Sequence, residues 1–336
     1  MTEHGEDLLS PARQLSDVEK DLVWKKPLSH KISEEERRIS KEIKRNWNRG
    51  EMKIANILLE GDAGSGKTQL AKALSANFGL PYTKVTCFAD MDKSDIMGAI
   101  LPVISSERSE RLDLVENTEG EEVEYRFYPS EIVRAYQNGY LLEIQEPNVI
   151  RDAAVLMALN SALELDGSIN LPTGIIRRHP DFVVVITANR SYVGSRPLNE
   201  ALRDRVQHAE KMDLPTKEVM IERAIAKIGY TTQQVLNVFA DTIIILDKTA
   251  KSNAIKGVAG MRSYFYWVDA VAGGASATES LYHKVIYKIT TDSEEIKILE
   301  AALKSNGLLA SLEKASIDAK NEVKNEVKKN EIITMP

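Results

Sequence analysis

Residues 61–68 read Gly61-Asp62-Ala63-Gly64-Ser65-Gly66-Lys67-Thr68, which fits the pattern G-x-x-x-x-G-K-[ST]. An apolar stretch, 54–59, precedes this loop, and a helix-prone stretch, 67–77, follows it. A strand before and a helix after are the context of a phosphate-binding loop, because the glycines let successive backbone N–H groups face one anion. The sequence therefore predicts a loop that binds the phosphates of a nucleoside triphosphate, which we expect to be ATP.

Two side chains at the end of this loop carry its chemistry. In a loop of this kind the lysine, here Lys67, reaches the β and γ phosphates. The hydroxyl of Thr68 holds Mg²⁺. ATP and Mg²⁺ are therefore the cofactors that the loop predicts.

The composition limits the classes of protein to consider. The chain has 336 residues, 43% of them hydrophobic and 28% charged, with a formal net charge of -6. The acidic balance argues against a chain whose main task is binding nucleic acid. Cys87 is the single cysteine, so an internal disulfide and a cysteine metal cage are excluded. No apolar run is long enough to span a bilayer and no export signal is visible, so we expect a cytoplasmic protein without a membrane segment.

The order of the apolar segments predicts an α/β domain followed by helices. Strand patterns at 82–87, 140–144 and 182–187 alternate with helical patterns at 130–137 and 151–165, which is typical of a parallel sheet flanked by helices. After residue 215 the patterns are helical, at 217–228, 232–246 and 262–272. We predict four parts: an N-terminal extension (1–40), a P-loop α/β core (41–214), a smaller helical lid domain (215–313) and a charged C-terminal tail (314–336).

Polar residues follow two of the predicted strands, where a hydrolase needs them. Gln145 and Glu146 come directly after one strand, and Asn189 follows another. Arg203 and Arg205 form a compact pair a short distance further on. Hydrolysis of a phosphoanhydride requires a carboxylate to orient water, a polar group near the γ phosphate and an arginine for the developing charge. The sequence offers candidates for all three.

With these motifs the chain resembles the AAA+ ATPases, and within them the MoxR group, especially the branch of CbbQ, NorQ and the cobalt chelatase small subunit. The resemblance runs from about residue 54 to residue 272. It rests on GDAGSGKT at 61–68, SDIMG at 94–98, FYPSEIVRAYQNGYLLEIQEP at 127–147, HPDFVVVITAN at 179–189, ALRDRV at 201–206 and VAGMRS at 258–263.

The resemblance implies a role for each matching residue. Glu146 is expected to orient or activate the attacking water, and Asn189 is the expected sensor near the γ phosphate. Arg205, beside Arg203, is the expected arginine finger, which in this family acts on ATP held by the next subunit of a ring, usually a hexamer. Arg262 opens the first helix after VAG and corresponds to the second sensor, which contacts the nucleotide from the lid.

Two insertions and one substitution refine the resemblance. The segments 105–127, with a hairpin arm at 121–127, and 168–178 resemble insertions that face a pore or a partner in relatives; alternatively they are surface hairpins without a contact role. Gln145 stands where the family pattern has Asp, which weakens support for Mg²⁺. Either Glu143, two residues earlier on the same strand face, supplies the missing charge, or hydrolysis is slow and nucleotide occupancy mainly shapes the ring.

Three features have an ordinary structural interpretation as well as a functional one. Arg203 and Arg205 could form surface ion pairs. The aromatic cluster 264–267 could stack on nucleic-acid bases, although packing inside the lid is the better interpretation. Cys87 could be a nucleophile, but no histidine is near it in sequence, so a small buried residue is expected.

The leading hypothesis is a MoxR-type AAA+ ATPase whose ring remodels or activates a partner protein. The resemblance suggests that this client or adaptor carries a von Willebrand factor A domain. A rival hypothesis is a nucleotide-gated structural module that binds ATP and hardly hydrolyses it. A weaker rival is a motor linked to nucleic acid.

Overall fold

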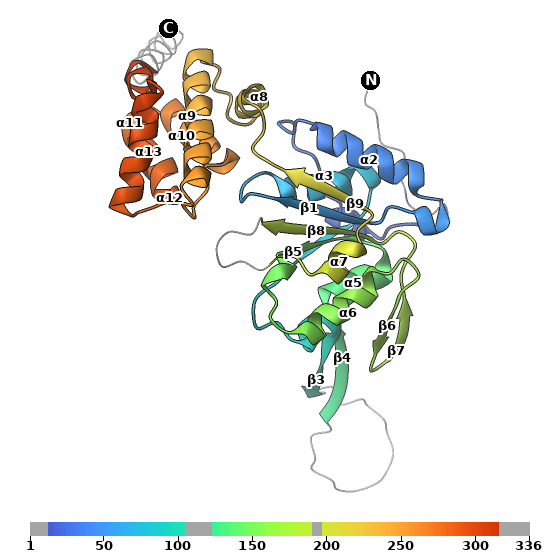
Figure 1. Cartoon of the computed structure of the whole chain (residues 1–336). Coiled ribbons are helices and arrows are strands. Elements are labelled where there is room, and N and C mark those ends of the chain that lie inside the picture. The colour runs from blue at the N-terminus through green and yellow to red at the C-terminus, as the bar shows by residue number, and fades with distance from the viewer. Residues whose placement is uncertain (1–12, 105–122, 190–196, 316–336) are drawn as a thin grey trace, which may run out of the picture.

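The computed structural model describes residues 13–104, 123–189 and 197–315, and residues 1–12, the middle of the first predicted insertion (105–122), 190–196 and most of the expected tail (316–336) lie outside it. The described chain forms an α/β core and a helical lid, which lie at opposite ends of the view in Figure 1. This arrangement confirms the predicted fold class, a parallel sheet flanked by helices with a smaller helical domain after it.

The core is built on one five-stranded parallel sheet with the strand order β2-β5-β8-β1-β9. Four of its strands were predicted within two residues at their starts. The strands are β1 Asn56–Gly61, β2 Tyr82–Thr86, β5 Leu141–Gln145, β8 Val183–Asn189 and β9 His208–Met212. The carboxyl ends of β1, β5 and β8 therefore meet at one edge, where a parallel sheet of this kind places its ligands.

Helices cover both faces of this sheet, as Figure 1 shows. On one face, α2 and α3 bury apolar side chains such as Ile39, Ile43 and Leu74 against β1 and β8. On the other face, α5 and α6 bury Ile132 and Leu159 among side chains from β5 and β8. Since both faces are covered, the central strands β1 and β8 are largely apolar and buried, whereas the edge strands β2 and β9 are more polar.

The helices begin where the sequence provides capping side chains. Ser33 accepts a hydrogen bond from the backbone N–H of Glu36, and Ser130 does the same for Val133. The described core helices are α1 Asp17–Leu22, α2 Glu34–Asn46, α3 Lys67–Phe78, α4 Lys93–Met97, α5 Glu131–Asn138, α6 Ala153–Leu163 and α7 Glu200–Asp204, with short 3-10 turns η1 Gly50–Met52 and η2 Pro147–Val149.

Two antiparallel hairpins project from the lower side of the core in Figure 1. One pairs β3 Gly98–Ile104 with β4 Val123–Pro129, and the other pairs β6 Ser168–Leu171 with β7 Gly174–Arg177. The second hairpin lies where the sequence predicted an insertion. The first begins earlier than expected, because β3 is itself one of its arms.

The lid is a separate helical unit with its own apolar core. At its centre the rings of Phe239 and Trp267 stack with centroids 3.7 Å apart. Trp267 donates from its indole N–H to the carbonyl of Ala277 at 2.9 Å. The lid helices are α8 Lys217–Ile228, α9 Gln233–Ser252, α10 Met261–Ala272, α11 Ala277–Leu281, the π-helical turn η3 Tyr282–Ile286, α12 Tyr287–Ile289 and α13 Ser293–Ser305.

The expected domain boundaries fall at three places in this architecture. Residue 40 lies inside α2, whose apolar face belongs to the core of the α/β domain. Residue 214 lies between β9 and α8, where the chain passes from the sheet to the lid. Residue 313 lies close to the end of the described chain, in a helical turn that packs on the lid.

Candidate nucleotide-binding site

The loop 61–68 takes a conformation that its glycines permit. Gly64 and Gly66 have φ values of 81° and 101°, a region that residues with a Cβ rarely adopt. At Gly61 a Cβ would lie 1.8 Å from the carbonyl oxygen of Met212 on β9, so no side chain fits there. The chain then enters α3 at Lys67, which directs the start of a helix toward the centre of the loop.

Lys67 lies at the centre of the site and is 8% exposed. Its Nζ donates to the carbonyl oxygens of Gly61 and Asp62 and to Oδ1 of Asn189, each at 2.9 Å. The ammonium group thus connects the phosphate loop to the end of β8. This is the geometry in which one bound phosphate can contact both the lysine and the predicted sensor residue.

Glu146 stands beside these two residues, directly after β5. Its Oε2 accepts a hydrogen bond from the backbone N–H of Asn189 at 3.1 Å. Its backbone is in the left-handed region, with φ of 55°, which is unusual for a residue with a side chain and turns the chain sharply at the strand end. Burial raises the pKa of the Glu146 carboxyl, and the Asn189 N–H and the Lys67 ammonium oppose the rise. A raised pKa is typical of a carboxyl that exchanges protons with a substrate.

The hydroxyl of Thr68 lies between the side chains of Glu143 and Gln145. It donates to Oε1 of Glu143 at 2.8 Å and accepts from Nε2 of Gln145 at 3.1 Å. The prediction that residues 143 and 145 share a strand face is therefore confirmed. It also means that a carboxylate contacts Thr68 although position 145 holds an amide.

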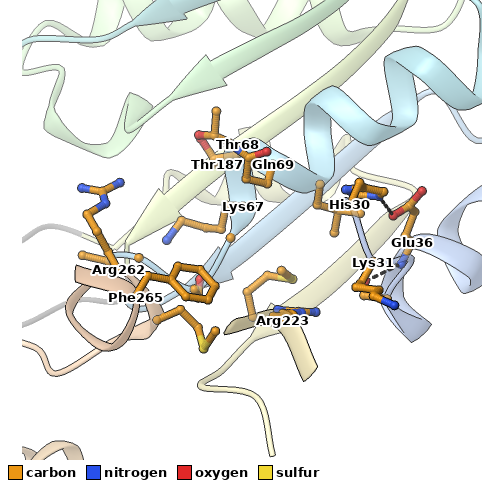
Figure 2. Close-up of a pocket in the computed structure, with 18 of the residues that line it drawn as sticks. His30, Lys31, Glu36, Lys67, Thr68, Gln69, Thr187, Arg223, Arg262 and Phe265 are labelled. Atoms are coloured by element: carbon orange, nitrogen blue, oxygen red, sulfur yellow. Dashed lines mark hydrogen bonds and ion pairs between the residues drawn. The ribbon is translucent and has the colours of Figure 1, made fainter. Parts of the chain in front are cut away.

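A cleft of about 960 Å³ opens over this loop, which is the size of a site for a nucleotide. Figure 2 shows Lys67 with Arg262 and Phe265 of the lid on one side and His30 and Lys31 on the other. The cations that line the cleft outnumber its two carboxylates, Glu36 and Glu146; they are Lys25, Lys31, Lys67, Lys84, Arg223, Lys227 and Arg262. A cleft of this charge suits a polyphosphate.

The sequence reasoning missed the N-terminal wall of this cleft, which residues 24–36 form. Glu36, only 2% exposed, holds this segment in place by accepting from Lys26 at 2.7 Å and contacting His30 at 2.8 Å. Burial raises the pKa of Glu36, but hydrogen bonds from His30, Lys26 and Asn77 outweigh it and hold the pKa at about 2. The sequence signal that could have indicated this wall was Glu36, an ionisable residue at the third position of a helix that is capped by Ser33 and has a buried apolar face.

The phosphate loop is joined to the lid by an ion cluster. Asp62 of the loop contacts Nζ of Lys251 on α9 at 2.6 Å, and the same Nζ contacts Asp247 at 2.7 Å. Both aspartates are 8% exposed, whereas the side chain of Lys251 is 45% exposed, so the cluster lies at the edge of the buried region. A displacement of the loop by a ligand would therefore act directly on a lid helix.

Arg262 also comes from the lid and lies at the first turn of α10. It lines the main cleft and a smaller hollow of about 290 Å³ beside Ala63 and Gly64. Its position next to the phosphate loop is where the second sensor was expected.

The structure does not bring Arg203 and Arg205 into this cleft. Arg203 pairs with Glu60 at 2.8 Å, and Arg205 pairs with Glu164 at 2.7 Å. Both lie on the outer surface of the same chain, at and just after α7. Within one chain they are the surface ion pairs of the ordinary interpretation, and neither contacts the loop 61–68.

Packing explains two other features that the sequence singled out. Tyr264 and Trp267 are fully buried in the lid, so they cannot stack on a base, whereas Phe265 faces the cleft and Tyr266 is exposed. Cys87 is 6% exposed, and burial raises the pKa of its thiol to about 12. This confirms the expectation of a small buried residue and removes the nucleophile interpretation.

The oxygen donors around Thr68 fit a magnesium ion. The Thr68 hydroxyl and the Glu143 carboxylate offer oxygen atoms there, whereas Gln145 turns its amide nitrogen toward both of them. Mg²⁺ prefers oxygen ligands, with one or two carboxylates and the phosphates of the substrate. Among residues 13–104, 123–189 and 197–315 no group of three His, Cys, Asp or Glu side chains could hold a metal by itself. A cation at Thr68 would thus depend on the nucleotide as well as on the chain.

Fold and site together define a P-loop nucleotide-binding protein of the α/β class, with a lid over the phosphate loop. Residues 56–206 match the family model of the AAA domain, dynein-related subfamily. The fold and this match support an AAA+ ATPase.

The curated relatives include uncharacterized proteins of Staphylococcus aureus strains NCTC 8325 and COL, each 33% identical over 186 residues. The matched part covers 54% of this chain and 65% of each relative. Among solved structures, the chain is similar to the Holliday junction branch migration motor RuvB of Thermotoga maritima, with a TM-score of 0.43 and 16% identity over 84% of this chain and 73% of that one. At that TM-score the likeness says nothing of activity.

Within the described part of the chain, every helix is too short or too polar to cross a bilayer.

Proposed function

We propose that this chain is a MoxR-type AAA+ ATPase that forms a ring, usually a hexamer in this family, and couples ATP hydrolysis to a change in a partner protein. The observation that carries the proposal is the convergence of Lys67, Glu146 and Asn189 at one edge of the sheet, where Asn189 forms a hydrogen bond with each of the other two. These are the three groups that phosphoanhydride hydrolysis needs inside one subunit.

Each group has a task that follows from its position. Backbone N–H groups of the loop and the Lys67 ammonium bind the phosphates. A magnesium ion at Thr68 would neutralise charge on the β and γ phosphates. Glu146, held by the Asn189 N–H, orients a water and takes its proton. Arg262 and the ion cluster of Asp62 then transmit occupancy to the lid.

The arginine that completes this site comes from a neighbouring copy. Support comes from Arg205, which lies outside the cleft of its own chain and whose side chain is 29% exposed, so that it is accessible to a neighbouring copy. We expect Arg205→Ala to lower phosphate release by about 10³-fold, the usual effect of removing such an arginine. Phosphate release by the purified variant measures this.

A mixing experiment separates an action in trans from a local defect. Arg205→Ala and Glu146→Gln are each expected to be inactive. In a randomly mixed ring of equal parts, about one quarter of the interfaces combine an intact Glu146 with an intact Arg205. The mixture should therefore recover up to about one quarter of the wild-type rate. A mixture no more active than its two components would contradict the ring with a shared site.

The proposed partner is a client or adaptor protein with a von Willebrand factor A domain. Support comes from the resemblance of the motifs and from the two hairpins, which expose apolar side chains such as Tyr125 and Ile175, both 70% exposed. Glu146→Gln in ATP should retain this protein, and wild type in ADP should release it. Mass spectrometry of the retained protein checks the proposal, and a retained client without that domain would contradict it.

A second candidate function is a nucleotide-gated structural module with little hydrolysis. The amide of Gln145 at Thr68 favours it, because an amide carries no charge for a cation. Assembly and tight ATP binding without turnover, even with the partner present, would favour this function.

A further inference from the structure

Glu143 is a buried carboxylate in the middle of the sheet. It lies on β5, between β2 and β8, and is 0% exposed. Four donors surround its two oxygens. Oε1 accepts from Thr68 at 2.8 Å, Gln145 at 3.0 Å and Thr187 at 3.1 Å, and Oε2 accepts from Tyr82 at 2.5 Å. An ionised carboxylate accepts all four of these bonds.

Among the described residues this buried carboxylate has no ion-pair partner. Within the part of the chain that the structure describes, no lysine, arginine or histidine forms an ion pair with Glu143. The ammonium group of Lys67 donates hydrogen bonds to Asn189 and two carbonyl groups. Hydrogen bonds alone compensate part of the cost of burying a carboxylate, so the site favours a cation beside it.

The amide of Gln145 cannot take the place of a carboxylate as a ligand of a cation, because it presents its N–H groups to the site. Its Oε1 accepts from the hydroxyl of Thr86 at 2.8 Å, while its Nε2 faces Thr68 and Glu143. Turning the amide over would place two acceptor oxygens 3.0 Å apart, at Gln145 and Glu143. The hydrogen bonds therefore fix the nitrogen on the side of Thr68.

We infer that Glu143, and not residue 145, supplies the negative charge of the cation site at Thr68. The inference rests on the proposed binding of ATP with Mg²⁺. In this arrangement the carboxylate lies two residues further back along β5 than the strand-end position and acts through the Thr68 hydroxyl, so Glu143 is a positioning residue. Gln145 is neutral and donates a hydrogen bond that helps to orient the Glu143 carboxylate.

Tyr82 contacts the oxygen of Glu143 that lies away from Thr68. Its hydroxyl occupies Oε2, on the side of the edge strand β2, and leaves Oε1 toward Thr68. Burial and the adjacent Glu143 carboxylate raise the pKa of the Tyr82 phenol, so it remains a donor at any physiological pH. Tyr82→Phe is therefore a control, because it removes a hydrogen bond from the oxygen of Glu143 that faces away from Thr68.

The test is the magnesium dependence of nucleotide binding, measured with a fluorescent ATP analogue in Mg²⁺ and in EDTA. Wild type should bind more tightly in Mg²⁺. In Glu143→Gln the ratio of the affinity in Mg²⁺ to the affinity in EDTA should be about 10- to 100-fold smaller than in wild type. This is the usual result of removing a carboxylate that supports a metal ligand. The exchange variant Glu143→Gln/Gln145→Glu, which moves the charge by two residues, should restore this ratio. Tyr82→Phe should change the Mg²⁺ effect by less than about threefold.

The outcomes distinguish this inference from the proposed function. Wild type that binds no nucleotide would contradict both. Wild type with a Mg²⁺ effect that survives in Glu143→Gln would overturn the inference alone. An exchange variant that stays insensitive to Mg²⁺, or a loss in Tyr82→Phe as complete as in Glu143→Gln, would also overturn it, because the loss would then reflect damaged packing of β5.

A second variant decides the question if Glu143→Gln does not fold. Gln145→Glu places a carboxylate oxygen where Nε2 now lies, 3.0 Å from Oε1 of Glu143. The repulsion should lower the melting temperature in EDTA, and Mg²⁺ with ADP should raise it by more than in wild type. An equal Mg²⁺ shift in the two proteins would overturn the inference.

Discussion

Replacing Lys67 with alanine is expected to abolish measurable ATP binding, a loss of about 100-fold or more. The reason is that charge-assisted hydrogen bonds to phosphate are each worth about 1.5–3 kcal/mol, and Lys67 lies where it can reach two phosphates. Its ammonium is nearly buried and already held by three acceptors at 2.9 Å, so it is oriented before the ligand arrives. Isothermal titration with ATP and Mg²⁺ measures the effect.

Lys93→Ala is the matched control, because Lys93 is an exposed lysine on α4 that does not line the cleft. It should bind ATP as wild type does, and both variants should unfold cooperatively. Lys67→Ala that binds ATP within about twofold of wild type would show that the loop is not the phosphate site.

The second large effect is expected for Glu146→Gln, which should bind ATP normally and release phosphate about 10²- to 10⁴-fold more slowly. Glutamine keeps the shape of the side chain and can still accept the Asn189 N–H, but it cannot take a proton from water. Release of inorganic phosphate under saturating ATP measures the loss, and Glu51→Gln, an exposed glutamate in η1, is the control. Equal rates for wild type and Glu146→Gln would remove Glu146 from the mechanism.

The pH profile gives an independent check of the same residue. The carboxylate form of Glu146 is required, and burial raises its pKa above the ordinary value of 4.5. The rate should therefore fall as the pH is lowered through this raised pKa, earlier than an ordinary glutamate would allow. The residual rate of Glu146→Gln should lack this acid limb. Circular dichroism at each pH should show that the fold is intact over the range in which the rate falls.

The parts of the fold that sequence reasoning predicted are those where one physical signal dominates. The strand before the loop is an apolar run followed by glycines, and α3 begins at the residue after Gly66. By contrast β9, with the sequence HAEKM, is mostly polar, and of its side chains only Met212 is buried. It is a strand because it pairs with β1 at the edge of the sheet, which is a tertiary cause.

The site was predictable to the extent that its residues follow strand ends. Gln145, Glu146 and Asn189 lie together because parallel strands end at one edge of the sheet. The wall formed by residues 24–36 was not predictable in this way. Its side chains reach the cleft through contacts made at long range, such as the Lys26 ammonium with Asn77 on α3 and Glu36. The pattern of polar and apolar residues within 24–36 does not predict those contacts.

Position 145 shows how a departure from a pattern acquires meaning from the structure. The sequence left open whether Glu143 or slow hydrolysis accounts for the glutamine. The structure places the Glu143 carboxylate 2.8 Å from the Thr68 hydroxyl. The alternation of side chains along a strand predicts only that residues 143 and 145 share a face, and not this contact. The ion cluster of Asp62 and Lys251 likewise became visible only when the lid and the loop were seen together.

The central claim is that the loop 61–68 binds ATP for hydrolysis by Glu146. Steady-state phosphate release by the purified chain, with ATP and Mg²⁺, tests it most directly when Glu146→Gln is measured beside it. We predict turnover in wild type, binding without turnover in Glu146→Gln, and no binding in Lys67→Ala. ATP binding with no turnover in wild type, with and without its partner, would contradict the claim.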